Sequence, residues 1–307
     1  MASDWYLKTS SNWKLVNNAF VKVSGSWKEI QEGYIKVSGA WKQFYQAFVA
    51  TAFSTATANT TIVVPDGANA IHVQAAVGGG SGGVMGAEYD KAGGESAGAG
   101  GASGGYVSDQ VYSVTQGETL TLTIGAAGAK STGSSYNTTA GNGGNTVLSG
   151  STTGTIFTLT GGVGGSGTGG GVQGPLRSNN PSTAGTATVA ATVLTSGSFK
   201  ESDGSSASIP SATTLDNGPV GSYNSSGNGV AGTNPGNCGG DNCQITGGVG
   251  GASYNGNISG GAGGVASSSN GGDGSRGSGA GGGGAQGQTN GGDGGAGEIV
   301  YRFLRVQ

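Results

Sequence analysis

The sequence predicts an all-β and partly irregular protein with essentially no α-helix. Two observations lead to this prediction: tryptophan recurs every 14 residues near the N-terminus, and glycine supplies 70 of the 307 residues. We expect residues 1–50 to form short β-hairpin repeats and residues 51–307 to form a glycine-rich domain. In that domain, β-type runs would form a shell around, or at one end of, a bundle of extended glycine segments with displayed loops.

The glycine content is compatible with either disorder or an unusual packed backbone. Glycine loses the most conformational entropy on folding and buries no side chain. Disordered chains usually combine high net charge with few aromatic residues. This chain has a formal net charge of only −3 and contains 4 Trp, 10 Tyr and 7 Phe. We therefore expect an ordered structure.

The N-terminal repeat extends beyond tryptophan. Trp13, Trp27 and Trp41 are each followed by lysine, and Phe20–Trp27 aligns with Tyr34–Trp41. Each unit has two short β-rich runs around a Ser-Gly-X turn, in which glycine can supply a positive φ. This pattern predicts a hairpin in each unit. A hairpin of this size is marginally stable alone. The aromatic residues must therefore pack against neighbouring repeats or a partner chain.

Three interpretations of these tryptophans, Trp5 included, stay open at this point. They form the core of a small domain, they attach the protein to a larger assembly, or they make a platform for carbohydrate. The first two interpretations are compatible with each other.

The glycine-rich part contains several β-type runs bordered by glycine. We expect strands at residues 60–64, 70–77, 106–114, 119–124, 155–160 and 298–306. A Pro-Asp-Gly turn at residues 65–67 joins the first two runs. These strands would supply the β shell.

Many glycines of this part recur every third residue. The series are Gly98, Gly101 and Gly104; Gly161, Gly164, Gly167 and Gly170; Gly271, Gly274 and Gly277; and Gly291, Gly294 and Gly297. Three residues per turn is the repeat of the polyproline II helix. Collagen needs long uninterrupted Gly-X-Y and abundant proline, whereas this chain has only 6 Pro. We expect several short extended segments packed side by side through backbone hydrogen bonds.

The order of these motifs resembles the glycine-rich domains of bacteriophage tail fibres. It runs from Val-Pro-Asp-Gly at 64–67, through Gly-Glu-Thr-Leu-Thr-Leu-Thr-Ile-Gly at 117–125, to Gly-Ala-Gly-Glu-Ile-Val-Tyr at 295–301. The likeness covers about residues 60–307 and includes the distal adhesins of T-even-type phages. It implies a polyglycine II helix bundle whose loops contact a receptor on the host. The 14-residue repeats and the segment between Gly174 and Ile245 depart from that pattern.

The polar inserts between glycine segments are the candidate receptor-binding loops, because binding sites often lie on loops held by a rigid scaffold. They span residues 84–92, 131–139, 253–259 and 286–290. Their tyrosine, asparagine and serine content is typical of paratopes. The candidate residues are Met85, Glu88, Tyr89, Asp90, Lys91, Tyr136, Asn137, Tyr254, Asn255 and Gln286. For any single residue, an ordinary polar turn is the alternative.

A long insert at residues 175–245 is a second candidate recognition element, and residues 186–194 within it have strand-like composition. It contains the only two cysteines, Cys238 and Cys243, which can close a small disulfide loop in an oxidising medium or stay as free thiols. A zinc site would need further ligands, and the only histidine, His72, lies in an expected strand far away in sequence. We expect no metal and no cofactor, and we interpret His72 as a strand residue rather than a catalyst.

Other function classes find little support. The chain has 13 Lys and Arg against 16 Asp and Glu, so it has no excess of basic residues for binding nucleic acid. No catalytic pair or phosphate-binding motif stands out, so we expect no enzyme. No apolar run is long enough to cross a membrane, and the first ten residues lack the pattern of a signal peptide. An ice-binding bundle would need a flat, regular Thr/Ala face, which the irregular inserts argue against.

We therefore expect an adhesin at the distal tail fibre or tail tip of a virion, synthesised in the host cytoplasm. Its expected partners are a bacterial outer-surface receptor, either protein or polysaccharide, and a tail-fibre protein that forms an oligomeric shaft. The alternative is a structural connector or a fibre assembly protein without receptor contact.

Overall fold

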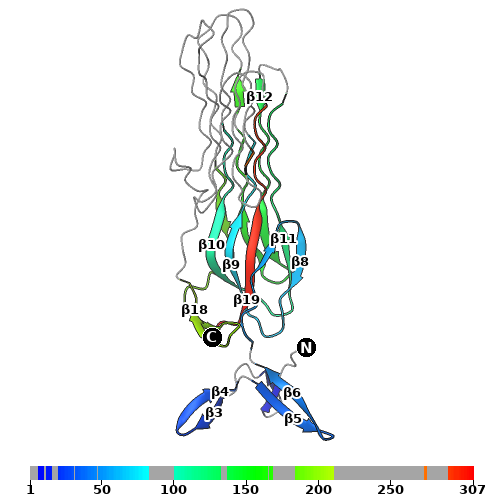
Figure 1. Cartoon of the computed structure of the whole chain (residues 1–307), viewed down its shortest axis with the longest axis vertical. Helices are drawn as coiled ribbons and strands as arrows, with labels where there is room; N and C mark the ends of the chain where they lie inside the picture. Colours follow the sequence, from blue (N-terminus) through cyan, green and yellow to red (C-terminus); the bar gives the residue numbers. More distant parts are fainter. Residues whose placement is uncertain are drawn as a thin grey trace, which may run out of the picture.

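A computed structural model of the chain describes residues 6–9, 12–15, 20–30, 32–46, 48–82, 100–132, 137–164, 166–168, 184–210, 273–274 and 290–307. The described part is all-β, as the sequence predicts, and contains no helix and no closed barrel. It therefore also lacks a helix long and apolar enough to cross a membrane. Three regions follow one another along the molecule (Figure 1).

The N-terminal region consists of three separate antiparallel hairpins. Their strands are β1 (Tyr6–Thr9) with β2 (Asn12–Leu15), β3 (Phe20–Val23) with β4 (Ser26–Glu29), and β5 (Glu32–Val37) with β6 (Ala40–Gln46). In the second hairpin Ser24 and Gly25 have φ of 48° and 86°, and Ser38 and Gly39 repeat this in the third. Positive φ at both central residues is the type I′ turn, whose twist suits a two-residue hairpin loop. The 14-residue repeat therefore encodes hairpins, as predicted.

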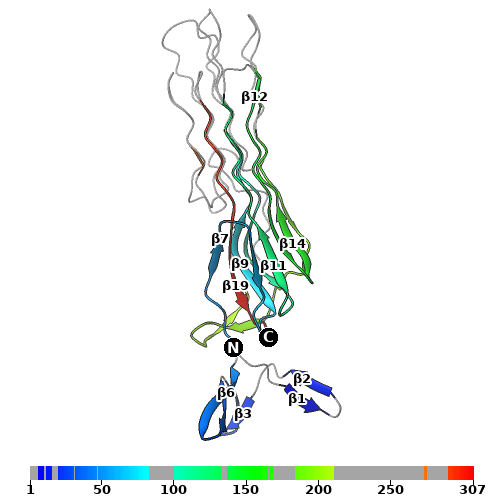
Figure 2. The same ribbon diagram turned by 90° about the vertical axis from the view of Figure 1, so that its right-hand side faces the viewer.

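Two antiparallel sheets form the middle region and pack face to face (Figure 2). The four-stranded sheet has the order β10-β9-β19-β7, and the five-stranded sheet has the order β16-β14-β13-β11-β8. The bounds are β7 Ser54–Ala56, β8 Thr60–Val63, β9 Ala70–Val77, β10 Tyr106–Ser113, β11 Thr119–Thr123, β13 Thr146–Gly150, β14 Gly154–Leu159, β16 Ala187–Val189 and β19 Glu298–Leu304. All six strands expected from composition are present. The final strand, β19, pairs with β9 in the centre of its sheet.

The main core lies between the two sheets. Strand β11 shows how the sequence builds it, because exposed threonines alternate with the buried Leu120 and Leu122. Ile71, Phe157 and Ile299 from neighbouring strands complete the same fully buried cluster. Continuous burial of this kind removes the apolar side chains of both sheets from water, which is the dominant stabilising contribution.

A second, smaller core covers the outer face of the four-stranded sheet near the C-terminus. The short hairpin of β17 (Ser198–Lys200) and β18 (Ser206–Ser208) lies there. Its Phe199, together with Ile209, packs against Val111 and Leu304 of the sheet. The part of the 175–245 insert that is described, residues 184–210, thus adds β16 to one sheet and covers the other.

The third region is a set of glycine segments that continue from the strands, away from the hairpins (Figures 1 and 2). We call segments 78–82, 100–105, 125–130, 141–145, 160–164, 184–186 and 290–297 the glycine bundle. The central segment, residues 78–82, is completely buried. Near the far end of the described part, β12 (Asn137–Thr139) pairs with β15 (Ser166–Thr168).

Hydrogen bonding within the bundle has a threefold repeat. Successive amides of segment 78–82 donate to three different neighbours, and every third amide returns to the same neighbour. The pairs are Gly78 to Gly105, Gly79 to Gly144, Gly80 to Gly295, Ser81 to Ala102 and Gly82 to Gly141, at 2.8 to 3.1 Å. The carbonyls of Gly79 and Gly80 accept from Gly162 and Gly128, which lie in two further segments. Three residues per turn without bonds inside a segment is the polyglycine II arrangement that the glycine spacing predicts.

Glycine is required in this bundle by close approach of the backbones. A Cβ at Gly79 would lie 2.0 Å from the carbonyl oxygen of Ala126, and one at Gly143 would lie 2.0 Å from that of Gly79. Both obstacles are backbone atoms, which cannot move without breaking their own hydrogen bonds. At these positions glycine is required for packing, because a side chain would separate the segments.

Candidate functional site

The hairpins expose aromatic side chains next to lysines. Trp27 and Trp41 are 68% and 69% exposed. In each hairpin the tryptophan faces a lysine across the strand pair, Lys22 in one and Lys36 in the other. Each lysine Nζ lies 5.9 Å from the centre of its indole ring, which is within reach of a cation–π contact. Three hairpins share this register, since Lys8 is opposite Trp13 in the first.

The opposite faces of the second and third hairpins are also apolar and exposed. Val21 and Val23 are each 45% exposed, and Ile35 and Val37 are 54% and 41% exposed. Apolar surface on both sides of isolated two-stranded sheets is typical of an interaction site rather than of a free surface. Trp27 and Trp41 do not form the core of a small domain, which removes that interpretation for these two residues. Only the backbone of Trp13 is described, and Trp5 lies outside the described residues.

The described residues that precede two of the predicted receptor loops lie at the far end of the bundle. The Gly82 amide donates to the carbonyl of Gly141, and the Gly141 amide donates to the carbonyl of Ala129. These hydrogen bonds hold the three residues side by side. Segment 83–99 follows Gly82, and segment 133–136 follows closely after Ala129. The bundle thus brings the starting points of two candidate loops together. Met85, Glu88, Tyr89, Asp90, Lys91, Tyr136, Tyr254, Asn255 and Gln286 lie outside the described residues, as do Cys238 and Cys243, and Asn137 is described only as backbone of β12.

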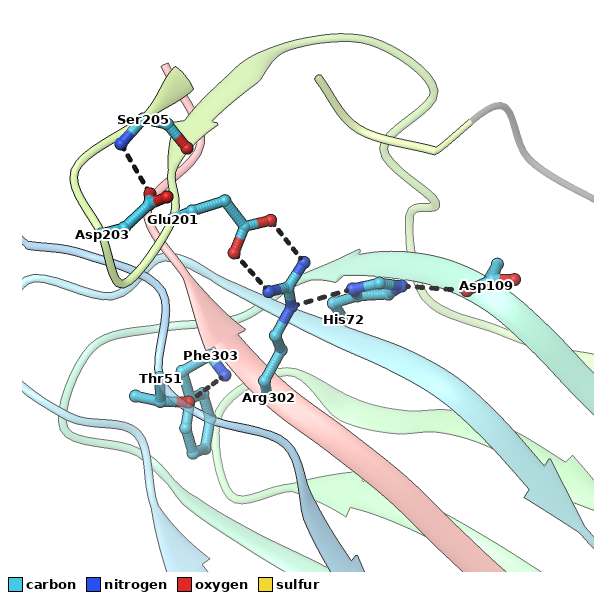
Figure 3. A network of polar contacts seen from close by, with 8 residues as sticks. All are labelled: Thr51, His72, Asp109, Glu201, Asp203, Ser205, Arg302 and Phe303. Atoms are coloured by element: carbon cyan, nitrogen blue, oxygen red, sulfur yellow. Dashed lines mark hydrogen bonds and ion pairs between the residues drawn. The ribbon is translucent and has the colours of Figure 1, made fainter. Parts of the chain in front are cut away.

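A network of charged side chains lies on the outer face of the four-stranded sheet (Figure 3). Arg302 of β19 donates two hydrogen bonds to Glu201, from Nη1 at 2.6 Å and from Nη2 at 3.0 Å. Its Nε donates to Nδ1 of His72 in β9 at 3.3 Å. The guanidinium also lies over the rings of Phe53 and Phe199, 4.5 and 5.2 Å from their centres. Arg302 therefore joins the β17–β18 hairpin to the sheet.

His72 is held in its neutral form by this arrangement. Because Arg302 donates to Nδ1, the proton of the neutral imidazole lies on Nε2, which is 3.4 Å from Oδ1 of Asp109. Burial and, after it, the nearby Arg302 charge lower the pKa of His72, and they outweigh the opposing effect of Asp109 and Glu201. The side chain is only 5% exposed. Its position in β9 agrees with the prediction of a strand residue.

Another carboxylate, Glu118, is buried at the base of the five-stranded sheet. It accepts hydrogen bonds from the backbone amides of Thr115, Thr152 and Thr153 and from the Thr153 hydroxyl, at 2.6 to 3.1 Å. Burial raises the pKa of Glu118, but these four hydrogen bonds outweigh it and leave the pKa below the ordinary value. Glu118 thus links the turn that begins at Thr115 to the turn that contains Thr152 and Thr153.

The outer face of the five-stranded sheet carries exposed threonines, among them Thr61, Thr119, Thr121 and Thr155. Threonine favours solvent-facing strand positions because its β-branched side chain fits a pleated surface. That propensity accounts for this face without a ligand.

The sequence did not predict the Arg302 network or the hydrogen bonds of Glu118 to the two turns. Arg302 and Glu201 are 101 residues apart, and no local motif connects them. In the described parts of the chain, no group of three or more His, Cys, Asp or Glu side chains is arranged to hold a metal ion.

The two sheets and the glycine bundle define the class of the protein: an all-β glycine-rich protein whose backbone segments pack directly on one another. The family model of the glycine-rich domain matches residues 54–304. Because this match spans most of the chain, the protein belongs to that glycine-rich domain family. A comparison with curated proteins gives no significant match.

Proposed function

We propose that this protein is a phage tail-fibre tip adhesin, which attaches through its N-terminal hairpins and recognises a bacterial surface at the far end of its glycine bundle. The observation that carries the proposal is that the hairpins and the glycine segments extend from opposite ends of the sandwich (Figure 1). Phe48, directly after the third hairpin, packs at the turn around Gly67, at the base of the sandwich. The glycine segments leave the opposite end of the same strands (Figure 1).

A binding tip of this kind benefits from a stiff support. Loops on a rigid scaffold lose less conformational entropy when they bind, and their affinity rises accordingly. The threefold hydrogen bonding of segment 78–82 ties five neighbouring segments to one buried centre. The expected receptor is an outer-surface protein or polysaccharide of the host bacterium.

The hairpin end suits attachment to an oligomeric fibre shaft. Residues 1–50 contain six lysines and three acidic residues, whereas residues 51–307 contain thirteen acidic and seven basic ones. Exposed Trp27 and Trp41 beside lysines favour a partner surface that is apolar and acidic. The three hairpins have the same Lys–Trp register. They therefore suit an oligomeric partner that offers several copies of one binding site.

Adsorption of the purified chain to host cells, in competition with phage particles, tests the proposal. We expect binding that saturates and blocks phage adsorption. Exchange of residues 84–92 or 253–259 for those of a relative with another host should change the cells that are bound. The variant W27A/W41A should still adsorb but should fail to join the fibre.

A structural connector or fibre assembly protein is the alternative function. It predicts the opposite pattern: loop exchange would leave host range unchanged, and purified protein would neither bind cells nor compete with phage. Loss of fibre assembly in loop variants would favour this alternative.

A further inference from the structure

The segment of the chain that leads into the sandwich, residues 48–53, is held by the β17–β18 hairpin as well as by the sheet. The Thr51 amide donates to the carbonyl of Phe303 at 3.1 Å, and the Phe303 amide donates to Oγ1 of Thr51 at 2.9 Å. The amide of Ala50, which is buried in the second core, donates to the carbonyl of Lys200 in β17 at 2.7 Å. Because Lys200 belongs to the hairpin, movement of the hairpin away from the sheet releases the Ala50 amide.

Arg302 joins this hairpin to the sheet and uses His72 as an acceptor (Figure 3). Two of its nitrogens donate to Glu201, which follows β17, and its Nε donates to Nδ1 of His72 at 3.3 Å. An imidazole nitrogen accepts a hydrogen bond only while it carries no proton. Protonation of Nδ1 would set two N–H donors and two positive charges against each other at this distance. The contact between Arg302 and His72 cannot persist in that form.

The ring of His72 is enclosed on several sides. Phe53, which precedes β7, packs against it edge-on, with ring centres 5.4 Å apart and ring planes at 66°. The charged groups that act on the ring are Arg302 from β19, Asp109 from β10 and Glu201 from the hairpin. Burial and, after it, the charge of Arg302 lower the pKa of His72, although the two carboxylates oppose them. The ring therefore binds a proton more readily once the hairpin has left and water reaches it.

Asp109 has a strained backbone at this site. Its φ is 47°, and in the described part of the chain it is the only residue other than glycine with a positive φ outside the N-terminal hairpin turns. The pairing of β10 with β9 includes both neighbours of Asp109 but passes over Asp109 itself. Such strain persists only where the surroundings impose it, and it is concentrated at ligand-binding and switching sites. Here it accompanies a carboxylate whose Oδ1 lies 3.4 Å from Nε2 of His72.

We propose that His72 and Arg302 form an acid-sensitive switch: a proton on Nδ1 of His72 displaces Nε of Arg302 and favours detachment of the β17–β18 hairpin from the sheet. Detachment frees the Ala50 amide and loosens the segment 48–53. The step transfers one proton from the solvent to Nδ1 and changes no other covalent bond. The switch goes beyond the proposed adhesin function and does not depend on it.

The direction of the pH effect follows from proton binding. In the detached state the ring meets water and takes up a proton at the ordinary histidine pKa of about 6.5, whereas in the closed state its pKa is lower. The closed state is therefore fully favoured above about pH 6.5, and this preference is lost as the pH falls toward the pKa of the closed state. Within this window the ratio of detached to closed hairpins rises by at most about ten-fold per pH unit, because one proton is bound.

Amide hydrogen exchange of the full-length chain tests the switch, with protection factors compared at about pH 7.5 and about pH 5.5. Ala50 and Gln307 report on detachment, because their amides donate to the carbonyls of Lys200 and Ser198 in the hairpin. The amides of β13, in the middle of the other sheet, report on unfolding of the whole sandwich. We expect the protection of Ala50 and Gln307 to fall by up to about ten-fold at the lower pH and to stay well below that of β13.

The variant His72→Asn is the matched control. The Oδ1 of asparagine lies at the same place along the side chain as Nδ1 of histidine, so it accepts from Arg302, and it binds no proton. We expect this variant to protect the Ala50 amide by nearly the same factor at both pH values. If it does not fold, His72→Gln replaces it with the same expectation.

Three outcomes overturn the switch. They are equal protection of Ala50 at both pH values in the wild-type chain, a fall in the control variant as large as in the wild type, and protection of Ala50 that equals that of β13 at both pH values. The last result would mean that only the sandwich as a whole responds to acid.

Discussion

The guanidinium of Arg302 donates two hydrogen bonds to the carboxylate of Glu201, at 2.6 and 3.0 Å. Arg302 belongs to the last strand of the chain, and Glu201 follows β17. The pair therefore fastens the hairpin that covers the second core. Side-chain exposure is 12% for Arg302 and 29% for Glu201, so water screens this contact less than a surface ion pair.

Replacement of Arg302 by methionine should reduce the free energy of unfolding by roughly 2 kcal/mol, because a half-buried carboxylate loses its partner. Glu201→Gln keeps an acceptor and should cost about 1 kcal/mol or less. Urea unfolding measures both values, and a double-mutant cycle gives the coupling between the two residues. Equal effects of the two variants with no coupling energy would contradict the role of this pair.

Stability should fall as the pH drops below about 6.5. In the unfolded chain His72 binds a proton near that pH, but in the folded protein its lowered pKa keeps it neutral. The unfolded state therefore takes up more protons, which favours unfolding by at most about 1.4 kcal/mol per pH unit until the folded pKa is reached. Unfolding temperatures measured at about pH 7.5 and about pH 5.5 show the size of this effect. Because His72 is the only histidine, His72→Gln should abolish most of it.

Gly79→Ala should disrupt the glycine bundle. The added methyl group would collide with the carbonyl of Ala126, and the amide and carbonyl of Gly79 both hold neighbouring segments. We expect a loss of roughly 3 kcal/mol or more, since overpacking against backbone cannot be relieved by a rotamer change. Ala127→Ser, at an exposed position of the same bundle, is the control and should be nearly neutral. Equal unfolding midpoints in urea for the two variants would show that the segments are not closely packed.

Glu118→Gln should destabilise the sandwich by about 2 kcal/mol. The amide group of glutamine offers one acceptor oxygen where the carboxylate uses both, and its NH₂ group would face backbone amides. Because the pKa of Glu118 is lowered on folding, its contribution is present above the ordinary glutamate pKa and is lost as the pH falls through the folded value. Urea unfolding at neutral pH and in acid should therefore show the difference between variant and wild type shrinking in acid.

Tryptophan fluorescence should report on the hairpins alone, because all 4 Trp lie within residues 1–50. In a Trp5→Phe/Trp13→Phe variant, emission comes only from Trp27 and Trp41, which are mostly exposed. We expect strong quenching by acrylamide and little change when the sandwich unfolds. Emission that resists quenching in the isolated protein would mean that these hairpins are already covered.

Strand positions and hairpin turns were predictable from local patterns. The alternation of threonine and leucine predicted β11, and Ser-Gly before a Trp-Lys pair predicted the turns at residues 24–25 and 38–39. Strand β13 was missed, because Thr146–Gly150 offers only two apolar residues between glycine-rich stretches. The β17–β18 hairpin was missed for a similar reason, since Phe199 is the only large apolar residue in its two strands.

The sequence by itself determined the kind of structure at each point: hairpins every 14 residues, alternating strands, and glycine segments with a repeat of three. Only the tertiary structure decided which segments meet. It placed Gly80 against Gly295, Arg302 against Glu201, and Asp293 against Lys130. The physical reason is that periodicity reflects the conformation of neighbouring residues, whereas glycine segments are chemically alike and can pair in many ways. Their partners are selected by the sandwich strands from which they emerge, whose side chains pack in one arrangement only.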